Sequence, residues 1–171
     1  MDSQFSPRIK DIIGYSREEA VRLGNDYIGQ EHLFLGILRD GEGMATDILE
    51  NLGISLAEMK ELIEKKIRTD RKIDMQAEIV MLKSTEKTLK LVYLEARSFK
   101  GATVNSGHLL LAILKDSDSI ITQLLVEYGV NYYMVRNQIQ DYKEEIEAKS
   151  DFPEGEDDDA NDDFTKGPMR Q

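Results

Sequence analysis

Cysteine is absent from all 171 residues of the sequence. Its absence excludes disulfide scaffolds, thiol nucleophiles and cysteine-ligated zinc, and nothing points to an oxidising compartment. Apolar runs are short and interrupted, and the N-terminus, Met1-Asp2-Ser3-Gln4, has neither the basic nor the apolar segment of a signal peptide. We therefore expect a soluble, cytoplasmic protein with no membrane partner.

Basic residues are fewer than acidic ones, 22 against 33, and the formal net charge is −11. Residues 151–163 contain eight acidic residues and no basic one, so subtracting their −8 leaves only −3 for the rest of the chain. Such a segment, with few apolar groups, cannot bury enough surface to become ordered, which predicts a disordered acidic linker or tail over residues 148–171. Because no basic stripe with interleaved aromatic residues is present, we do not expect a nucleic-acid partner.

One unit is used twice in this sequence. Residues 29–40 (GQEHLFLGILRD) match residues 105–116 (NSGHLLLAILKD) at a spacing of 76 residues. The same offset places Gly53 on Gly129 and His32 on His108. An internal repeat of this kind predicts two structurally equivalent units.

The apolar residues of each unit recur at three and four positions, which is typical of amphipathic helices. Four helices are predicted for the first unit, over residues 6–24, 30–39, 44–52 and 55–67. Ser6 is the expected N-cap of the first, with Pro7 at its first position. Gly53 is placed to end the third helix, and Ser55 and Glu58 form a capping-box pattern that opens the fourth.

The second unit repeats this plan, with its first helix expected to start at Thr85 and its last helix to run from Asn131 through Ile146. The predicted segments are a first repeat over 1–68, a connector over 69–84, a second repeat over 85–147 and the acidic tail over 148–171. A four-helix unit of this size buries a small core, so the halves should share an interface. The fold class expected is all-α, with about eight helices in two pseudo-twofold-related four-helix repeats that form one compact domain.

No catalytic, nucleotide or metal site is expected. The Gly41-Glu42-Gly43 turn lacks the lysine and hydroxyl of a phosphate-binding loop. His32 and His108 occupy equivalent positions far from a second histidine at ligand spacing, which favours a packed or hydrogen-bonded role in the fold. The acidic pattern that begins at Asp157 lacks the glycine and the glutamate of a calcium loop, since Asp162 and Pro168 stand in their places.

The two repeats differ at the start of their second helices, where Glu31 precedes one histidine and Gly107 precedes the other. A carboxylate in the first turn of a helix is favoured by the macrodipole, so Glu31 could simply stabilise the helix end. Alternatively, Glu31 binds a guanidinium, and Ser6 with the amides that follow it binds an anion, provided that the two helix starts converge. An enzyme that pairs Glu31 with Glu18 or Glu19 is a third hypothesis, but no complete acid–base constellation is visible.

Four stretches of the chain carry a family resemblance: Phe5-Ser6-Pro7-Arg8, residues 18–24 (EEAVRLG), residues 28–36 (IGQEHLFLG) and residues 41–45 (GEGMA). Together they resemble the Clp N-terminal repeat, in two copies over residues 5–147. The pattern is most similar to the N-terminal domains of ClpC-type AAA+ unfoldases, the ATP-binding subunits of ATP-dependent Clp proteases.

This resemblance implies a non-catalytic domain that captures protein substrates and adaptor proteins and passes them to the AAA+ modules of the parent chain and its ClpP protease. It also implies binding of phosphoarginine, with Ser6 matching the hydroxyl and Glu31 the glutamate of one site. In the second, degenerate site Thr85 supplies the hydroxyl, whereas Gly107 removes the carboxylate. ATP and magnesium are expected only in ATPase modules, whose motifs this sequence lacks. The alternative is a stand-alone Clp-repeat adaptor or scaffold.

Overall fold

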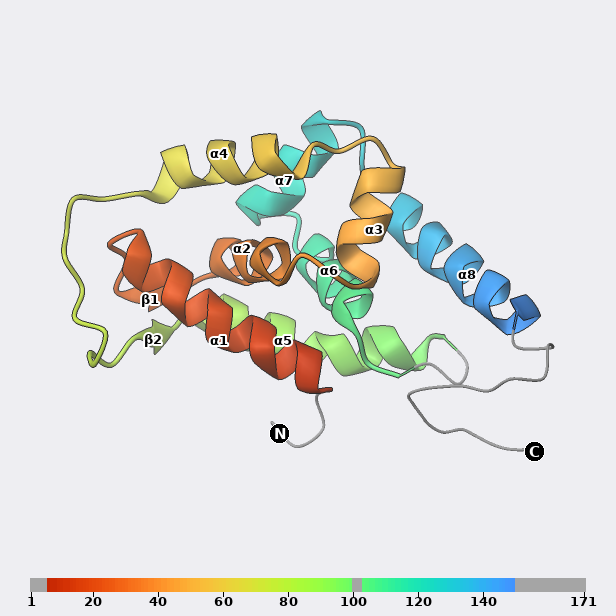
Figure 1. The fold of residues 1–171 in the computed structure, drawn as a ribbon, viewed down its shortest axis with the longest axis horizontal. Coiled ribbons are helices and arrows are strands. Elements are labelled where there is room, and N and C mark those ends of the chain that lie inside the picture. The colour runs from red at the N-terminus through yellow and green to blue at the C-terminus, as the bar shows by residue number, and fades with distance from the viewer. Residues whose placement is uncertain (1–5, 100–102, 150–171) are drawn as a thin grey trace. The chain divides into compact units, whose positions relative to one another are not determined.

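A computed structural model describes residues 6–99 and 103–149 of the chain, with side chains to residue 142 (Figure 1). The elements are α1 (Pro7–Arg22), β1 (Tyr27–Ile28), α2 (Gln30–Asp40), α3 (Met44–Asn51), α4 (Leu56–Ile67), β2 (Val80–Met81), α5 (Lys83–Arg97), α6 (Ser106–Leu114), α7 (Ile120–Glu127) and α8 (Tyr132–Lys149). The chain divides into two units, Met1–Asn137 and Gln138–Gln171, with the boundary inside α8. The site and both repeats' first three helices therefore belong to the first unit.

Helix α1 begins where the sequence predicts. The Ser6 hydroxyl accepts a hydrogen bond from the Ile9 amide at 3.3 Å, and Pro7 occupies the first helical position, where no amide donor is needed. The buried face of α1 includes Ile9, Ile12 and Ala20, which repeat at helical spacing. The expected N-cap and apolar face are both confirmed.

The two repeats follow one plan at the offset of 76 residues. The first residues of α1, α2, α3 and α4 are Pro7, Gln30, Met44 and Leu56, and those of α5, α6, α7 and α8 are Lys83, Ser106, Ile120 and Tyr132. Gly53 and Gly129, at φ of +87° and +85°, turn the chain after α3 and α7. Left-handed backbone of this kind suits glycine, so the predicted helix ends are confirmed.

The start of the second repeat differs from the prediction. Helix α5 begins at Lys83 rather than at Thr85, and Leu82, the equivalent of Ser6, occupies the N-cap position. Thr85 lies one turn inside the helix at the position equivalent to Ile9 and is fully buried. Sequence alone missed this boundary because Leu82 offers no capping oxygen to mark it. The last helix begins one residue after Asn131 and continues to Lys149, beyond the predicted end of the repeat at 147.

Two short strands were not predicted. Strand β2 pairs in parallel with β1, with Tyr27 opposite Val80 and Ile28 opposite Met81. Each strand has only two residues, which is too short to show a two-residue period in the sequence. The pairing carries the chain from the first repeat to the start of α5 beside the start of α2.

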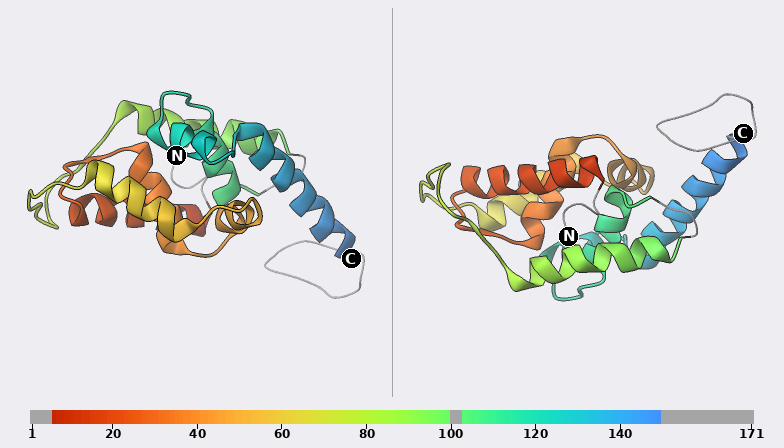
Figure 2. Two further views of the ribbon diagram at one scale, coloured as in Figure 1. Left: turned by 90° about the horizontal axis from the view of Figure 1, so that it is seen from above. Right: turned by 90° about the horizontal axis from the view of Figure 1, so that it is seen from below.

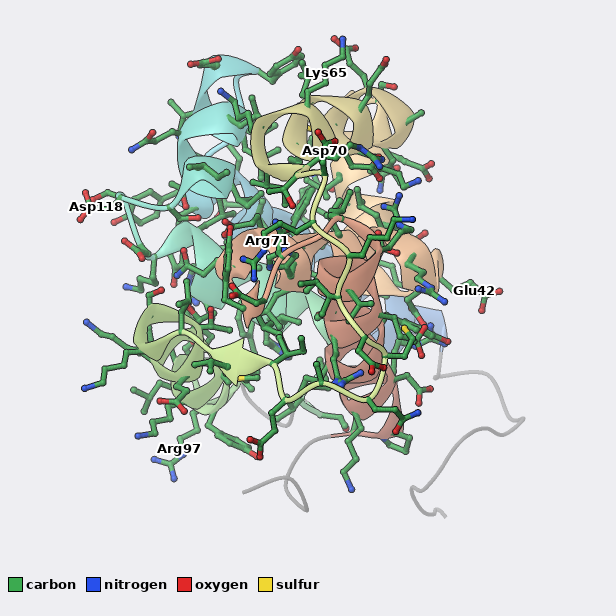
Figure 3. All side chains as sticks on the ribbon, turned by 90° about the vertical axis from the view of Figure 1, so that its left-hand side faces the viewer. Glu42, Lys65, Asp70, Arg71, Arg97 and Asp118 are labelled. Atoms are coloured by element: carbon green, nitrogen blue, oxygen red, sulfur yellow. The ribbon has the colours of Figure 1, made fainter. Side chains whose placement is uncertain are left out.

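The connector between α4 and β2 is held against α1. The Thr69 amide donates to the Leu23 carbonyl at 2.9 Å, and the Arg17 guanidinium donates to the carbonyls of Met75 and Ala77 at 3.0 and 2.5 Å. Figure 3 shows Asp70 and Arg71 on the connector after it leaves α4. These hydrogen bonds to the backbone of the connector explain why this polar segment has a defined position against α1.

The repeats share an interface within the first unit. Helix α3 packs on α6, and α2 contacts both α5 and α7. In the view from below, α6 lies between α1 and α5 (Figure 2). The Gln30 amide crosses this interface, donating to the Thr88 hydroxyl at 2.7 Å and to the Asp116 carboxylate at 3.0 Å. The buried polar group is thereby satisfied, and it fixes the register between the repeats.

The fold class is therefore confirmed as all-α, with eight helices arranged as the expected Clp-type double repeat in the described part of the chain. No helix among the described residues is long and apolar enough to cross a membrane. Residues 150–171, which hold the predicted acidic tail, lie outside the described residues.

Candidate functional site

The start of α2 is fixed by a buried histidine. His32 Nδ1 accepts a hydrogen bond from the Gly29 amide at 2.9 Å, so Nε2 carries the proton and donates to the Asn25 side-chain oxygen at 2.7 Å. Burial lowers the pKa of His32 to about 4, and nearby Glu19 opposes this shift. In α6, His108 Nδ1 accepts from the Asn105 amide at 3.1 Å. The prediction that both histidines are packed, hydrogen-bonded groups is confirmed.

Glu31 presents a half-buried carboxylate at this helix start. Its side chain folds back over Gly29, so that a methyl group on Gly29 would lie 2.6 Å from Glu31 Oε1. Burial raises the pKa of Glu31, although a hydrogen bond from its own backbone amide acts in the opposite direction. Among residues 6–99 and 103–142, no lysine or arginine pairs with this carboxylate. A desolvated carboxylate without a cation is favourably placed to accept one.

The first turn of α5 lies next to Ile28, at the start of the helix that carries Glu31. The Ile28 carbonyl accepts hydrogen bonds from the Leu82 amide at 3.1 Å and from the Thr85 hydroxyl at 2.9 Å. No side chain caps α5, so the amides of Lys83 and Ser84 have no intrahelical acceptor. We call Glu31, Tyr27 and the turn Leu82–Ser84 the α2–α5 site. It joins a carboxylate to the positive end of a helix dipole.

Tyr27 forms one side of the α2–α5 site. Its ring meets the His32 ring edge-on, with centroids 5.1 Å apart. Burial, and then the charges of Glu31 and Asp26, raise the pKa of the Tyr27 hydroxyl. The phenol is therefore neutral at pH 7.

The structure does not bring Ser6 and Glu31 together. Helix α1 has 16 residues and is therefore about 24 Å long, and Asn25, just beyond its C-terminal end, contacts His32 at the start of α2. Figure 1 accordingly shows β1 and the start of α1 at opposite ends of α1. The expected convergence of these two helix starts is wrong, because α2 starts beside the end of α1.

The start of α1 instead lies near the start of α6. A methyl group on Gly43 would touch both Ser106 Oγ, at 3.1 Å, and the Arg8 side chain, at 3.3 Å. Arg8 also pairs with Asp40 at 2.6 Å, which ties the start of α1 to the end of α2. Ser6, at the start of α1, therefore lies near the start of α6, the helix that carries Gly107.

The two residues of the degenerate second site are likewise apart. Thr85 is buried beside the start of α2, where its hydroxyl is engaged by Ile28, and Gly107 is buried at the start of α6. The Gly107 amide donates to the Asn105 side chain at 2.8 Å, so α6, unlike α5, is capped. The hydroxyl that the resemblance assigns to Thr85 therefore faces the core.

The other carboxylates considered in the enzyme hypothesis are engaged in ion pairs. Glu19 is buried and contacts Arg22 at 2.7 Å and Arg39 at 3.2 Å, and Glu18 contacts Arg39 at 2.7 Å. Both carboxylates therefore already have arginine partners within the fold. Within the described residues, no group of three metal-ligating side chains comes together.

Sequence reasoning missed the turn Leu82–Ser84 as part of the site. The signal was present, since Leu82 stands 76 residues after Ser6 and so marks the start of the equivalent helix. The parallel pairing of β1 and β2, which brings this turn to the start of α2, leaves no comparable trace in the sequence.

Comparisons with known proteins show the family of the chain. The family model of the Clp repeat (R) N-terminal domain matches residues 4–128 and 83–161. The chaperone protein ClpB of Oceanobacillus iheyensis is 32% identical over 139 residues, which cover 81% of this chain and 17% of that protein. The ClpC/MecB protein of Bacillus subtilis, a negative regulator of genetic competence, is 30% identical over the same shares of the two chains.

Solved structures show the same fold. The N-domain of ClpV from Vibrio cholerae has a TM-score of 0.66 at 14% identity, covering 80% of this chain and 83% of that one. The N-terminal domain of ClpD from Arabidopsis thaliana has a TM-score of 0.62 at 17% identity, covering 83% and 96%. The present chain spans about a sixth of the length of its ClpB and ClpC relatives. It belongs to the family of Clp repeat N-terminal domains.

Proposed function

We propose that this chain is the substrate- and adaptor-recognition domain of a Clp-family ATP-dependent unfoldase that delivers proteins to a ClpP protease. The family membership supports this, as does a relative in Chlamydia pneumoniae, 32% identical, named a probable ATP-dependent Clp protease ATP-binding subunit. ATP and magnesium belong to ATPase modules, whose motifs this sequence does not contain. The cytoplasmic location and the alternative of a stand-alone adaptor stay predictions.

The α2–α5 site is proposed to bind phosphoarginine on protein substrates. Phosphoarginine joins a planar guanidinium to a phosphate, so its receptor needs a carboxylate and an anion-binding group side by side. Glu31 provides the first, and the uncapped amides at the start of α5 provide the second. The unpaired, half-buried carboxylate beside an uncapped helix start is the observation that carries the proposal.

One such site is expected per chain. It keeps Glu31, but its anion-binding group differs from the one that the sequence predicted. Ser6 is replaced as the anion-binding group by the turn Leu82–Ser84, because this turn is hydrogen-bonded to Ile28, just before α2, whereas Ser6 lies at the far end of α1. The equivalent position near the start of α1 has Gly107 in place of the carboxylate, so it lacks a partner for the guanidinium.

Replacing Glu31 with glutamine tests the site directly. Glu31→Gln keeps the shape of the side chain and removes its charge, so affinity for phosphoarginine should fall by about tenfold or more. Isothermal titration calorimetry measures this loss, with arginine and phosphoserine as ligands that satisfy only half of the site. Glu61→Gln, an exposed substitution on α4, is the matched control and should bind as the parent does. Equal affinity of Glu31→Gln and the parent would exclude Glu31 as the guanidinium acceptor.

A methyl group on Gly29 should displace the same carboxylate without removing it. Gly29 has φ of −105° and ψ of 179°, which alanine adopts without strain, so Gly29→Ala should fold. The new methyl group would lie 2.6 Å from Glu31 Oε1, which must move, and binding should weaken several-fold. Combining Gly29→Ala with Glu31→Gln should cause little further loss, since both changes act through one carboxylate. Additive losses would show that Gly29 acts by another route.

A further inference from the structure

Helix α5 presents a stripe of basic side chains. Lys83, Lys87, Lys90 and Arg97 are exposed and, at about 100° per residue, fall on one narrow face of the helix together with Leu94. We call these five residues the α5 stripe. Glu86, beside the stripe, is the exposed acid of this helix, whereas Glu95 is buried and accepts a hydrogen bond from Tyr132.

The cations of the α5 stripe have no carboxylate partner among the described residues, unlike most of the arginines elsewhere in that part of the chain. Arg8, Arg22, Arg39, Arg68 and Arg71 each lie within 4.0 Å of an acidic side chain. None of the four basic residues of the stripe does, although Glu86 stands only three or four residues from Lys83 and Lys90. Figure 3 shows the Arg97 side chain extending away from the ribbon at the end of α5. Four positive charges are therefore left without compensation on one face of an acidic protein.

We propose that the α5 stripe is a docking surface for an acidic segment of a partner protein. The stripe runs from Lys83 to Arg97, a rise of about 21 Å, which an extended segment of about six residues spans. Carboxylates of such a segment pair with the four cations. Leu94, 57% exposed between Lys90 and Arg97, contacts one apolar side chain of the partner. This surface shares Lys83 with the α2–α5 site, but it needs neither Glu31 nor a phosphorylated arginine and therefore goes beyond that site.

A protein partner fits the α5 stripe better than a nucleic acid does. The stripe carries no aromatic side chain on which a base could stack, and its apolar member, Leu94, is aliphatic. A duplex carries one phosphate charge per about 1.7 Å, so over the roughly 21 Å of the stripe it would bring about twelve negative charges against four cations. A short acidic peptide brings fewer negative charges than a duplex does, and it can offer an apolar residue to Leu94.

Binding of a synthetic peptide to the full chain tests this proposal. The probe is a fluorescently labelled peptide of about ten residues, made of glutamates around a central leucine, and its control has glutamine in place of every glutamate. Fluorescence anisotropy at low salt should show saturable binding of the acidic peptide and at least about tenfold weaker binding of its control. Affinity should fall as salt is added, since exposed ion pairs are screened.

Charge reversal on the protein locates the binding. The double variant Lys87→Glu with Lys90→Glu should bind the acidic peptide about tenfold or more weakly than the parent does. The double variant Lys87→Arg with Lys90→Arg should bind it as the parent does. Lys65→Glu with Lys66→Glu, on α4, changes net charge equally and should have little effect. Glu31→Gln should leave peptide binding unchanged, which separates this surface from the phosphoarginine site.

Three results would overturn the proposal. The first is equal loss from reversal on α4 and on α5, which would mean non-specific attraction. The second is equal binding of the acidic peptide and its glutamine control. The third is tighter binding of a single-stranded oligonucleotide than of the acidic peptide, lost on the same α5 reversal, which would make the stripe a nucleic-acid surface. Melting temperatures of all variants verify that each one is folded.

Discussion

Replacing Gly36 with alanine should lower the free energy of unfolding by about 3 kcal/mol. Helices α1 and α2 approach so closely at this residue that a methyl group would lie 2.6 Å from the Ile12 carbonyl oxygen and 2.7 Å from Ser16 Oγ. Ser16 already donates a hydrogen bond to that same carbonyl at 2.8 Å, so neither atom can move without breaking a buried pair. The two helices must separate, and their core contacts are lost.

Gly14→Ala is the matched control for Gly36→Ala. Gly14 lies in the middle of α1 with no other atom within 4 Å of an added methyl group. Alanine should therefore raise stability there by about 0.5–1 kcal/mol through helix propensity alone. Urea denaturation followed by circular dichroism compares the two variants. In the second repeat the residue equivalent to Gly36 is an alanine, Ala112, and the residue equivalent to Ser16 is Val92. If Gly36→Ala were as stable as the parent, the close packing of α1 on α2 would be wrong.

Stability should fall as the pH is lowered from about 7.5 to 5, by about 2 kcal/mol from His32 alone. The pKa of His32 is about 4 in the folded protein, against an ordinary value of 6.5. Between these two values the unfolded chain binds a proton that the folded chain does not, so acid favours unfolding. Protonation of the folded state would also break the hydrogen bond that Nδ1 accepts from Gly29, because that nitrogen would become a donor.

Two measurements check this pH dependence. The ring signals of His32 in NMR spectra should titrate near pH 4, and a midpoint near 6.5 would contradict the buried, neutral ring. The urea-derived free energy of unfolding should fall with pH in the parent and less steeply in His32→Gln, which cannot protonate. Most carboxyl groups titrate below pH 5, so their effect lies largely outside this window.

The helices were predictable from sequence because their determinants are local. Ser6 and Pro7 mark one start, Gly53 and Gly129 mark two ends, and the offset of 76 residues transfers the plan of the first repeat to the second. Where a local signal was missing, the prediction failed. Leu82 gives α5 no capping oxygen. The helix start was therefore predicted at Thr85, which is a better N-cap residue but belongs to the core.

The candidate site was predictable only in part. Glu31 was singled out because the equivalent residue of the second repeat is Gly107. In the structure its carboxylate is half-buried and has no cation partner among the described residues. Its neighbours depend on how the repeats dock, which no spacing within one repeat reveals. The parallel pairing of β1 with β2 and the hydrogen bonds of Ile28 bring the start of α5 to the start of α2, whereas the length of α1 keeps Ser6 away.

The central claim is that the α2–α5 site binds phosphoarginine, and an amide NMR titration of the full chain with free phosphoarginine tests it most directly. The account predicts saturable shifts at Glu31, Lys83 and Ser84, absent with arginine or phosphoserine and lost in Glu31→Gln. Shifts confined to Ser6 and its neighbours, or no response specific to phosphoarginine, would contradict it.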